Sequence, residues 1–321
     1  MNRARLAVLG LVALALAGLV FVWSLLGSAT IAKDTSFTIP AGASVSAVAD
    51  KLEAEGLISS ASGFVLQARI FGSDAPIQAG EFLLTPDMSQ GDILAAFQSG
   101  DVIRRFVTIP EGMPSILVWE RLMAEDLLTG EVDVPPEGSI LPDTYDFERG
   151  QSRKALVERM QAAMDKALAE EWANRSPRIA VDTMRDALIL ASIVEKETGK
   201  PEERRMVAGL YSNRVRTGMM LQADPTIIYP ITKGKPLGRR IRQSEIAAVN
   251  GYNTYTRVGL PEGPITNPGR ASIAAVMNPE TTNALFMVAD GTGGHWFADT
   301  LAEHNANVAK WYAIRRERGE M

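Results

Sequence analysis

Two glutamates, Glu195 and Glu197, stand at the end of an otherwise apolar segment, ALILASIVEKETG, which runs from Ala187 to Gly199. Its periodicity predicts a helix that begins near Asp182 and ends near Thr198, because glycine suits the position after a helix. A carboxyl group at that end meets the negative pole of the helix dipole, and burial adds to this effect, so both raise its pKa. A glutamate that keeps its proton near neutrality can act as a general acid.

A helical wheel does not decide which of the two glutamates has this role. At 100° per residue, Glu195 and Glu197 fall on different faces, and neither face is plainly the solvated one. The alternative interpretation is an ordinary charged helix end, with Lys196 and Arg204 as ion-pair partners. Both interpretations remain open from the helix alone.

The segments that follow offer polar groups for a site. A second helix is predicted over Pro201 to Thr217, with proline in its first turn and glycine after its end. Next, Gln222 and Asp224 are expected in a turn set by Pro225, beside an apolar strand.

A long loop, Asn250 to Gly269, is rich in Asn, Thr, Tyr, Gly and Pro. Loops of that length in a compact domain are usually functional. Tyrosine rings and amide groups together are typical of a carbohydrate groove, although a ligand-free Ω-loop would look similar. The last segment predicts a hairpin around Asp290 to Gly294 and a final helix, in which His295 and His304 are expected to be structural.

Composition excludes several classes of site. The chain has 321 residues, no cysteine and only two histidines, so disulfides, thiolate sites and a cysteine nucleophile are excluded. Neither a metal nor a cofactor is expected, because a zinc site would have to draw its remaining ligands from carboxylates. The net charge of −5 gives no general attraction to nucleic acid.

The N-terminus predicts membrane attachment. After the tail of residues 1–5, residues 6–26 carry no charge and are long enough for a transmembrane helix. Arg3 and Arg5 place the N-terminus in the cytoplasm. The alternative is a cleaved signal peptide, but the apolar run is longer than a usual signal core. In a bacterium we therefore expect a single-pass protein of the inner (plasma) membrane with its catalytic domain in the periplasm.

The exported chain contains an internal repeat. FTIPAGASVSAVADKLEAEGLI, from Phe37, aligns without a gap with VTIPEGMPSILVWERLMAEDLL, from Val107. Each copy predicts a strand, a Pro-Gly turn and an amphipathic helix. Residues 35–150 therefore resemble LysM-like α+β modules, which bind glycan, and the alternative is that they are spacers. Residues 151–321 are expected to form a mixed α/β catalytic domain, so that the fold class as a whole is α+β.

Several segments, taken together and in order, closely resemble the endolytic murein transglycosylases, the MltG or YceG-like family. They are LASIVEKET, LQADPTIIY, YNTY, GLPEGPITNPG and VADGTGGHWF. The resemblance covers nearly the whole chain and implies a lytic transglycosylase, a non-hydrolytic lyase. Its implied partners are peptidoglycan glycan strands and, from the membrane location, peptidoglycan synthases.

The resemblance also implies roles for individual residues. The family's catalytic glutamate matches Glu197, and Glu195 is expected to support it. Substrate-binding or supporting roles are implied for Gln222, Asp224, Tyr252, Asn253, Tyr255 and Asn267. Two alternatives remain: a hydrolytic muramidase of the same groove, with Glu197 as acid and Asp224 as base, and a wall-binding scaffold without activity that uses the LysM-like region.

Overall fold

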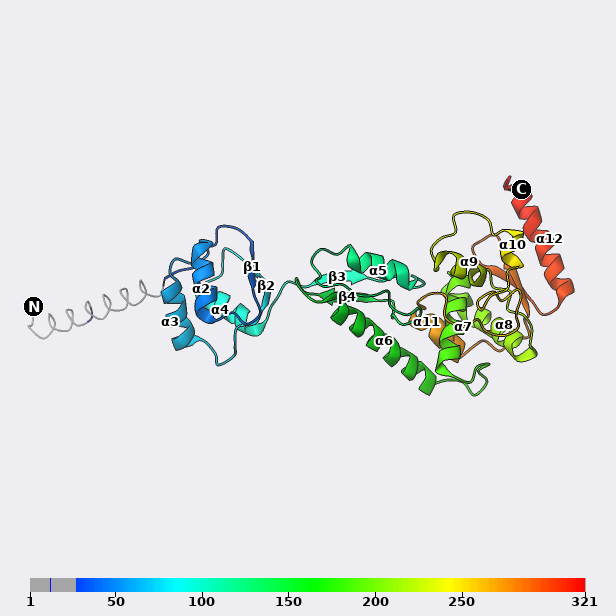
Figure 1. Ribbon diagram of the computed structural model, residues 1–321, viewed down its shortest axis with the longest axis horizontal. Helices are drawn as coiled ribbons and strands as arrows, with labels where there is room; N and C mark the ends of the chain where they lie inside the picture. The colour runs from blue at the N-terminus through cyan, green and yellow to red at the C-terminus, as the bar shows by residue number, and fades with distance from the viewer. Residues whose placement is uncertain (1–11, 13–26, 321) are drawn as a thin grey trace, which may run out of the picture. The chain divides into compact units, whose positions relative to one another are not determined.

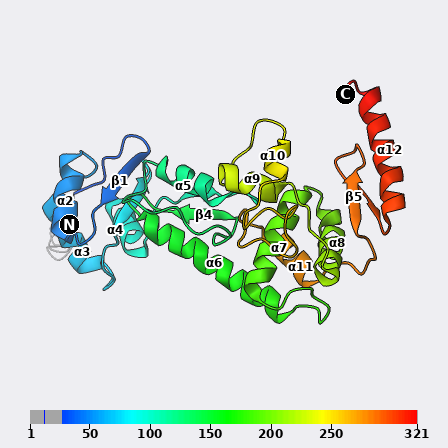
Figure 2. The same ribbon diagram turned by 45° about the vertical axis from the view of Figure 1, so that its right-hand side comes forward.

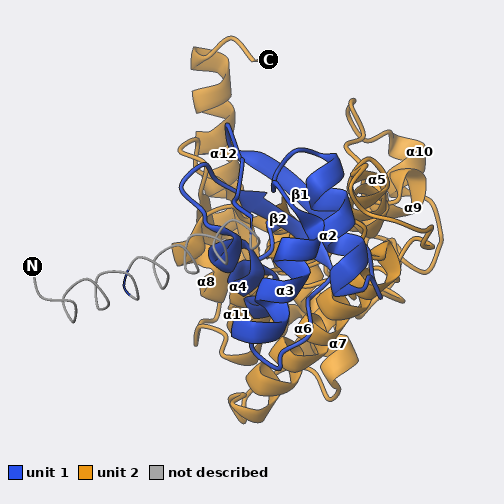
Figure 3. Ribbon diagram, turned by 90° about the vertical axis from the view of Figure 1, so that its left-hand side faces the viewer, with its two compact units in different colours: residues 1–105 blue, residues 106–321 orange. Residues whose placement is uncertain are grey.

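The computed structural model describes residue 12 and residues 27–320 (Figure 1). The predicted transmembrane segment, residues 6–26, lies outside the described residues except for Val12. Within the described part of the chain, no helix is both long enough and apolar enough to cross a membrane. Contacts divide the chain into two compact units, residues 1–105 and 106–321 (Figure 3).

The first unit is built around one antiparallel pair of strands. Its elements, in order, are β1 (Thr35–Ile39), α2 (Val45–Ala54), α3 (Ala61–Phe71), β2 (Gly80–Leu84) and α4 (Gln90–Ser99). Strands β1 and β2 pair with Phe37 opposite Phe82, and both rings are buried with Phe97 of α4. Three aromatic rings therefore form the centre of this unit, where α4 packs against the paired strands.

The second unit begins with the second copy of the repeat. Its first elements are β3 (Arg105–Thr108), α5 (Ser115–Met123), β4 (Thr144–Phe147) and α6 (Arg153–Ala173), and β3 pairs with β4. The predicted strand, turn and helix are therefore present in both copies. Apolar side chains of all four elements form one core, which includes Val107, Val118, Phe147 and Met160.

The rest of the second unit is mainly helical. Its elements are α7 (Met184–Glu197), η1 (Pro201–Glu203), α8 (Arg204–Thr217), α9 (Pro225–Thr232), α10 (Gln243–Ile246), α11 (Arg270–Met277), β5 (Phe286–Ala289), β6 (His295–Ala298) and α12 (Leu301–Glu317). Helices α7, α8 and α11 contact one another and enclose a second core. Helix α12 lies beside the β5–β6 hairpin (Figure 2).

Serine and threonine residues cap many of the helices at their starts. At six helix starts, a serine or threonine hydroxyl accepts a hydrogen bond from a backbone N–H of the first turn. These caps are Ser44, Ser60, Ser89, Ser152, Thr183 and Thr300.

The strand predicted beside Pro225 is wrong, because residues 225–232 form helix α9. Proline occupies the first turn, where its missing N–H costs nothing. The apolar character of this segment suggested a strand, but Ile227 and Tyr229 are buried by helical packing instead. As a result, residues 151–321 contain only the β5–β6 hairpin as regular sheet among the described residues.

Helix α6 belongs to both cores of the second unit. Leu156 and Met160 lie in the core of the repeat, and Met164 lies in the core around α7. Asn267, fully buried, adds polar links between the same two regions. The limit near residue 150, which the sequence analysis places between two domains, therefore falls inside one compact unit.

Candidate active site

Glu197 is the last residue of α7 and lies at the edge of a pocket of about 260 Å3. The helix stops there because Thr198 adopts extended backbone angles and Pro201 follows. Residues from α7, α8, the α9 start, the long loop and the β5–β6 hairpin line the pocket: Glu197, Leu210, Tyr211, Arg214, Gln222, Asp224, Tyr255, Met287, Val288, Ala289 and His295.

Two larger hollows, of about 740 and 730 Å3, lie elsewhere in the second unit. One is bordered by Trp119 and the loop around Pro135, and the other by Arg178 and Asn278. The smaller pocket is selected by its chemistry rather than its volume, because Glu197, Asp224 and Tyr255 converge on it.

The electrostatics of this pocket act on Glu197. Burial, and then the negative charge of Asp224, raise the pKa of Glu197 to about 7. A hydrogen bond from Tyr211 and the positive charge of Arg214 act in the opposite direction. Glu197 therefore carries a proton below about pH 7 and is ionised above it. A group with a pKa near the working pH can act first as an acid and then as a base.

Arg214 on α8 is a buried cation with its own structural bonds. Its Nη1 donates to the carbonyl oxygen of Leu221 at 2.7 Å, and its Nε donates to that of Leu285 at 2.7 Å. Burial lowers the pKa of Arg214. The same guanidinium thus holds the segment before Gln222 and the segment before β5 while it places positive charge near Glu197.

Two tyrosines complete the polar wall. Tyr211 is fully buried on α8, and burial raises its pKa well above the ordinary value. The Tyr255 hydroxyl donates to Oδ1 of Asp224 at 2.6 Å. Burial and this bond to Asp224 also raise the pKa of Tyr255, so both hydroxyl groups remain protonated donors in the site.

Gln222 has a backbone conformation that side chains rarely adopt. Its φ of 51° lies in the left-handed region, and its N–H donates to the Thr254 carbonyl oxygen at 3.1 Å. The side chain is exposed and lines the pocket. Such strain persists only where the surroundings hold it, and it is concentrated at functional sites.

Asn253 and Tyr252 lie away from this pocket. Asn253 is fully buried, and its Nδ2 donates to the carbonyl oxygens of Ile246 at 2.9 Å and Ala248 at 2.7 Å. Its Oδ1 accepts from the N–H of Tyr255 at 2.9 Å. Tyr252 packs against Tyr229, with ring centroids 4.8 Å apart. The geometry gives Asn253 the task of holding the loop that carries Tyr255.

Asn267 also makes only structural contacts in the described residues. Its Oδ1 accepts from the N–H of Ile140 at 3.0 Å, and its Nδ2 donates to the carbonyl oxygen of Met113 at 2.9 Å and to Oγ of Ser115 at 3.0 Å. A fully buried amide with bonds on both sides positions the loop that follows Pro264.

Glu195 points away from the pocket. Its Oε2 accepts from the N–H of Gly269 at 2.9 Å and from Oγ of Ser272 at 2.7 Å. Gly269 caps α11, so the carboxylate lies at the positive pole of that helix. The two glutamates therefore serve different elements: Glu195 holds α11, and Glu197 faces the pocket.

Three polar residues that line the pocket were not among the candidates from sequence: Tyr211, Arg214 and His295. Tyr211 and Arg214 are three residues apart on α8, so they share one face of that helix with apolar residues. Polar side chains on an apolar face are a sequence signal that could have indicated a site. Across the described residues, no group of three or more histidine, aspartate and glutamate side chains could hold a metal ion.

Comparisons with known proteins identify a family and several similar proteins. The model of the YceG-like family matches residues 37–310. A protein of Streptococcus pneumoniae serotype 2 (strain D39), named endolytic murein transglycosylase, is 29% identical over 322 residues, which cover 85% of this chain and 57% of that protein. A protein of Bacillus subtilis (strain 168) with the same name is 26% identical over 329 residues, which cover 90% of this chain and 89% of that protein.

A solved structure is also similar. It is the crystal structure of a putative YceG-like protein from Listeria monocytogenes, with a TM-score of 0.53 and 27% identity. The match covers 85% of this chain and 98% of the Listeria chain. This chain spans only somewhat more than half of the streptococcal relative, 57% of its length.

Proposed function

The chain belongs to the YceG-like family, and on that premise we propose that it is an endolytic lytic transglycosylase that cleaves MurNAc–GlcNAc bonds in peptidoglycan and limits the length of nascent strands. The observation that carries the proposal is Glu197, with a pKa raised to about 7, among hydrogen-bond donors in one pocket. The names of the Streptococcus and Bacillus relatives support the same reaction.

The reaction follows from one carboxyl group used twice. Glu197 gives its proton to the glycosidic oxygen, the C1–O bond breaks, and an oxocarbenium-like centre forms at C1 of MurNAc. The Glu197 carboxylate then takes the proton from the C6 hydroxyl of the same sugar, whose oxygen bonds to C1. The products are a 1,6-anhydro-MurNAc end and a free GlcNAc hydroxyl, and Glu197 has regained its proton.

The neighbouring charges suit both steps. Arg214 offsets the negative charge that appears on Glu197 when the proton leaves. Asp224 places negative charge in the same pocket, which favours the positive charge that develops at C1. Gln222 and Tyr255 line the pocket and offer donors to the sugar hydroxyl and acetamido groups.

The test is a digest of purified peptidoglycan by the full chain in detergent, read by mass spectrometry. Anhydro-MurNAc ends from the parent, and none from Glu197→Gln, would support the proposal. Reducing ends, heavier by one water, would instead identify the hydrolytic alternative. Cleavage by neither protein would leave the scaffold alternative and overturn the proposed reaction.

The hydrolytic alternative is tested further at Asp224, because a muramidase in this pocket would use that carboxylate as its base. Asp224→Asn should then abolish cleavage. The transglycosylase proposal expects that variant to remain active with a rate reduced by about tenfold, since only an electrostatic contribution is lost.

The pH dependence is a separate prediction. Because the protonated form of Glu197 is the acid and its pKa is about 7, kcat/KM should be highest below pH 7. Above it, kcat/KM should fall about tenfold per pH unit. Initial rates of anhydro-end formation between pH 5 and 9, with circular dichroism at each pH as a control for folding, measure it. A flat profile up to pH 9 would contradict the assignment.

Glu195→Gln should separate the two glutamates. We expect cleavage to change by less than about threefold, because Glu195 bonds to α11 and not to the pocket. The free energy of unfolding should fall by about 0.5–1 kcal/mol, because the charge at the α11 N-terminus is lost. Initial rates and thermal denaturation measure both, and complete loss of cleavage in a folded variant would exclude a supporting role.

Membrane attachment is part of the proposal. We propose that residues 6–26 cross the bacterial inner membrane once, with residues 1–5 in the cytoplasm and the remaining chain in the periplasm. The uncharged length of the segment and the preceding Arg3 and Arg5 support this arrangement. This location would favour association with membrane peptidoglycan synthases.

We further propose that the first unit is LysM-like and contacts glycan. Its order of β1, α2, α3 and β2, with an antiparallel pair of strands, supports this proposal. The test is a pull-down on insoluble peptidoglycan with residues 27–321 and with residues 106–321. Loss of retention when residues 27–105 are removed would support the contact, and equal retention would contradict it.

A further inference from the structure

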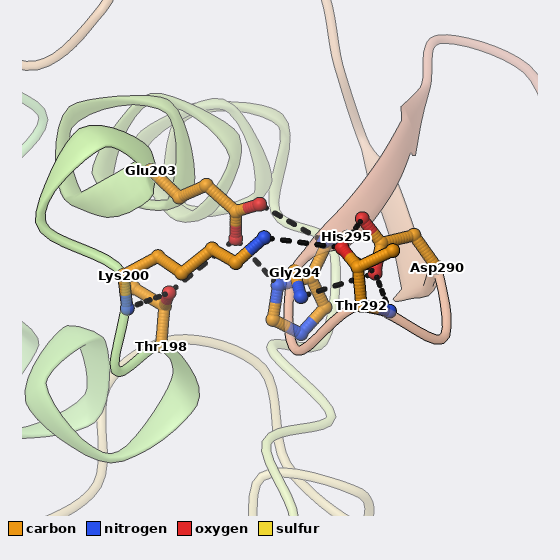
Figure 4. Close-up of polar contacts among 7 residues, drawn as sticks. All are labelled: Thr198, Lys200, Glu203, Asp290, Thr292, Gly294 and His295. Atoms are coloured by element: carbon orange, nitrogen blue, oxygen red, sulfur yellow. Dashed lines mark hydrogen bonds and ion pairs between the residues drawn. The ribbon is translucent and has the colours of Figure 1, made fainter.

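A polar cluster joins the segment directly after Glu197 to the turn between β5 and β6 (Figure 4). It consists of Thr198, Lys200, Glu203, Asp290, Thr292, Gly294 and His295. The hairpin contributes Met287, Val288 and Ala289 to the wall of the Glu197 pocket. The cluster therefore connects the residue after the candidate acid to the hairpin that also lines the acid's pocket.

Glu203 is the centre of this cluster. Its Oε1 accepts from the backbone N–H of His295 at 3.0 Å, and its Oε2 lies 2.8 Å from Nδ1 of His295. Thr198, the residue next to the acid, donates its hydroxyl to the same Oε2 at 3.4 Å. One carboxylate thus bonds to the C-terminal end of α7, to the start of β6 and to the imidazole ring.

The turn itself is pressed closely against this carboxylate. A β-carbon on Gly294 would overlap Oε1 of Glu203 and Nζ of Lys200, so a larger residue there would push these two side-chain ends aside. Lys200 donates to Oγ1 of Thr292 at 3.2 Å, and Asp290 accepts from the N–H of Gly294 at 3.1 Å. These bonds hold the turn itself, and Glu203 alone among these residues bonds to the His295 ring.

The ring of His295 has one nitrogen left for a ligand. A carboxylate only accepts, so Nδ1 donates its proton to Glu203, and in the neutral ring Nε2 is then an acceptor. Nε2 makes no hydrogen bond within the described part of the chain, although the ring is only 18% exposed and lines the pocket with Glu197. A half-buried ring with an unbonded nitrogen, in a residue that lines a polar pocket, suits a hydroxyl donor.

We propose that His295 is a substrate-positioning residue whose Nε2 accepts a hydrogen bond from a sugar hydroxyl in the Glu197 pocket, and that Glu203 orients the ring for this bond. This inference rests on the proposed glycan substrate, and it extends that function to a residue for which the sequence indicates only a structural role.

Two substitutions at His295 separate positioning from structure. Asn places an amide N–H where Nδ1 lies, so His295→Asn keeps the bond to Glu203 and removes Nε2. Gln places its amide where Nε2 lies, so His295→Gln removes the Nδ1 donor instead. In the full chain, we expect His295→Asn to keep the parent Tm and lower kcat/KM about tenfold, mainly through KM. His295→Gln should lower Tm and retain more of kcat/KM.

Glu203→Gln and a matched control complete the set. Once Nε2 is absent, loss of its orienting partner should cost no further activity, so Glu203→Gln should lower kcat/KM alone but not in combination with His295→Asn. Thr292→Val removes a bond of the same turn without touching the pocket, and its kcat/KM should remain within about twofold of the parent. Full activity of His295→Asn, or additive losses with Glu203→Gln, would overturn the proposal.

A binding measurement distinguishes failure of this inference from failure of the proposed reaction. Binding is measured in the Glu197→Gln variant, which serves here as the parent. Calorimetry with a GlcNAc–MurNAc oligosaccharide should show about tenfold weaker binding when His295→Asn is added to it. If this weakening is seen but the unsubstituted protein forms no anhydro ends, the inference stands and the proposed reaction is wrong. If binding is unaffected by His295→Asn, the inference is wrong whatever the reaction. If the parent does not bind the glycan, both are wrong.

Discussion

Glu197→Gln is expected to lower the rate of glycan cleavage about a thousandfold or more, because the amide can neither give nor take the proton that both steps transfer. The substitution preserves shape and the hydrogen bond with Tyr211, so substrate binding should remain near the parent value. Initial rates and calorimetric affinities measured on the same preparations would show this loss in kcat without a matching loss in binding.

The same substitution should stabilise the fold at high pH. The pKa of Glu197 is about 7 in the native state against an ordinary value of 4.5. As pH rises through this interval, the unfolded chain releases a proton that the native chain keeps, so the free energy of unfolding of the parent falls. Above pH 7 this cost is on the order of 3 kcal/mol, and glutamine does not incur it.

Thermal denaturation across pH measures this cost. Glu197→Gln should exceed the parent Tm by several degrees at pH 8 and differ little from it at pH 4. Asp224→Asn is the matched control, because it removes a charge that raises the pKa of Glu197. The difference in Tm at pH 8 between Asp224→Asn and Glu197→Gln should therefore be smaller than the difference between the parent and Glu197→Gln. Equal Tm values of parent and Glu197→Gln at both pH values would contradict a raised pKa.

Arg214→Met should have the second largest effect. The substitution keeps an apolar stem but leaves the buried carbonyl group of Leu221 and the half-buried one of Leu285 without this donor. Each such loss costs about 1–3 kcal/mol, so we expect the free energy of unfolding to fall by about 3 kcal/mol. Cleavage should fall about a hundredfold, because the segments carrying Gln222 and the hairpin are no longer held.

The loss of charge at Arg214 has a further consequence. The guanidinium lowers the pKa of Glu197, so the alkaline limb of the activity profile should move to higher pH in the variant. Arg216→Met is the matched control, because Arg216 lies on the same helix but is exposed and does not line the pocket. An Arg214→Met variant with the parent Tm, or with an unmoved alkaline limb, would contradict this role.

Local structure was predictable wherever one element contained its own signals. The start of α7 at Thr183, the first turn at Pro201 and the long loop after Asn250 follow from caps, proline and composition. Helix α9 was mistaken for a strand because of the apolar character of its segment, and the packing of Ile227 and Tyr229 overrides that interpretation.

The candidate site was predictable only in part. The sequence by itself determined that a helix ends on two glutamates and that Gln222, Asp224 and Tyr255 lie in segments able to reach a cleft. Periodicity could not separate Glu195 from Glu197, because a wheel describes one helix and not its neighbours.

Only the tertiary structure decided the roles. It directs Glu195 to the start of α11, and it buries Asn253, whose amide bonds to carbonyl groups at the end of the neighbouring helix α10. It also brings Arg214 and His295 to the pocket from elements that lie further along the chain. The reason is physical: burial and the charges within a few ångströms set the pKa of a carboxyl group, and both are properties of segments that meet only when the chain has folded.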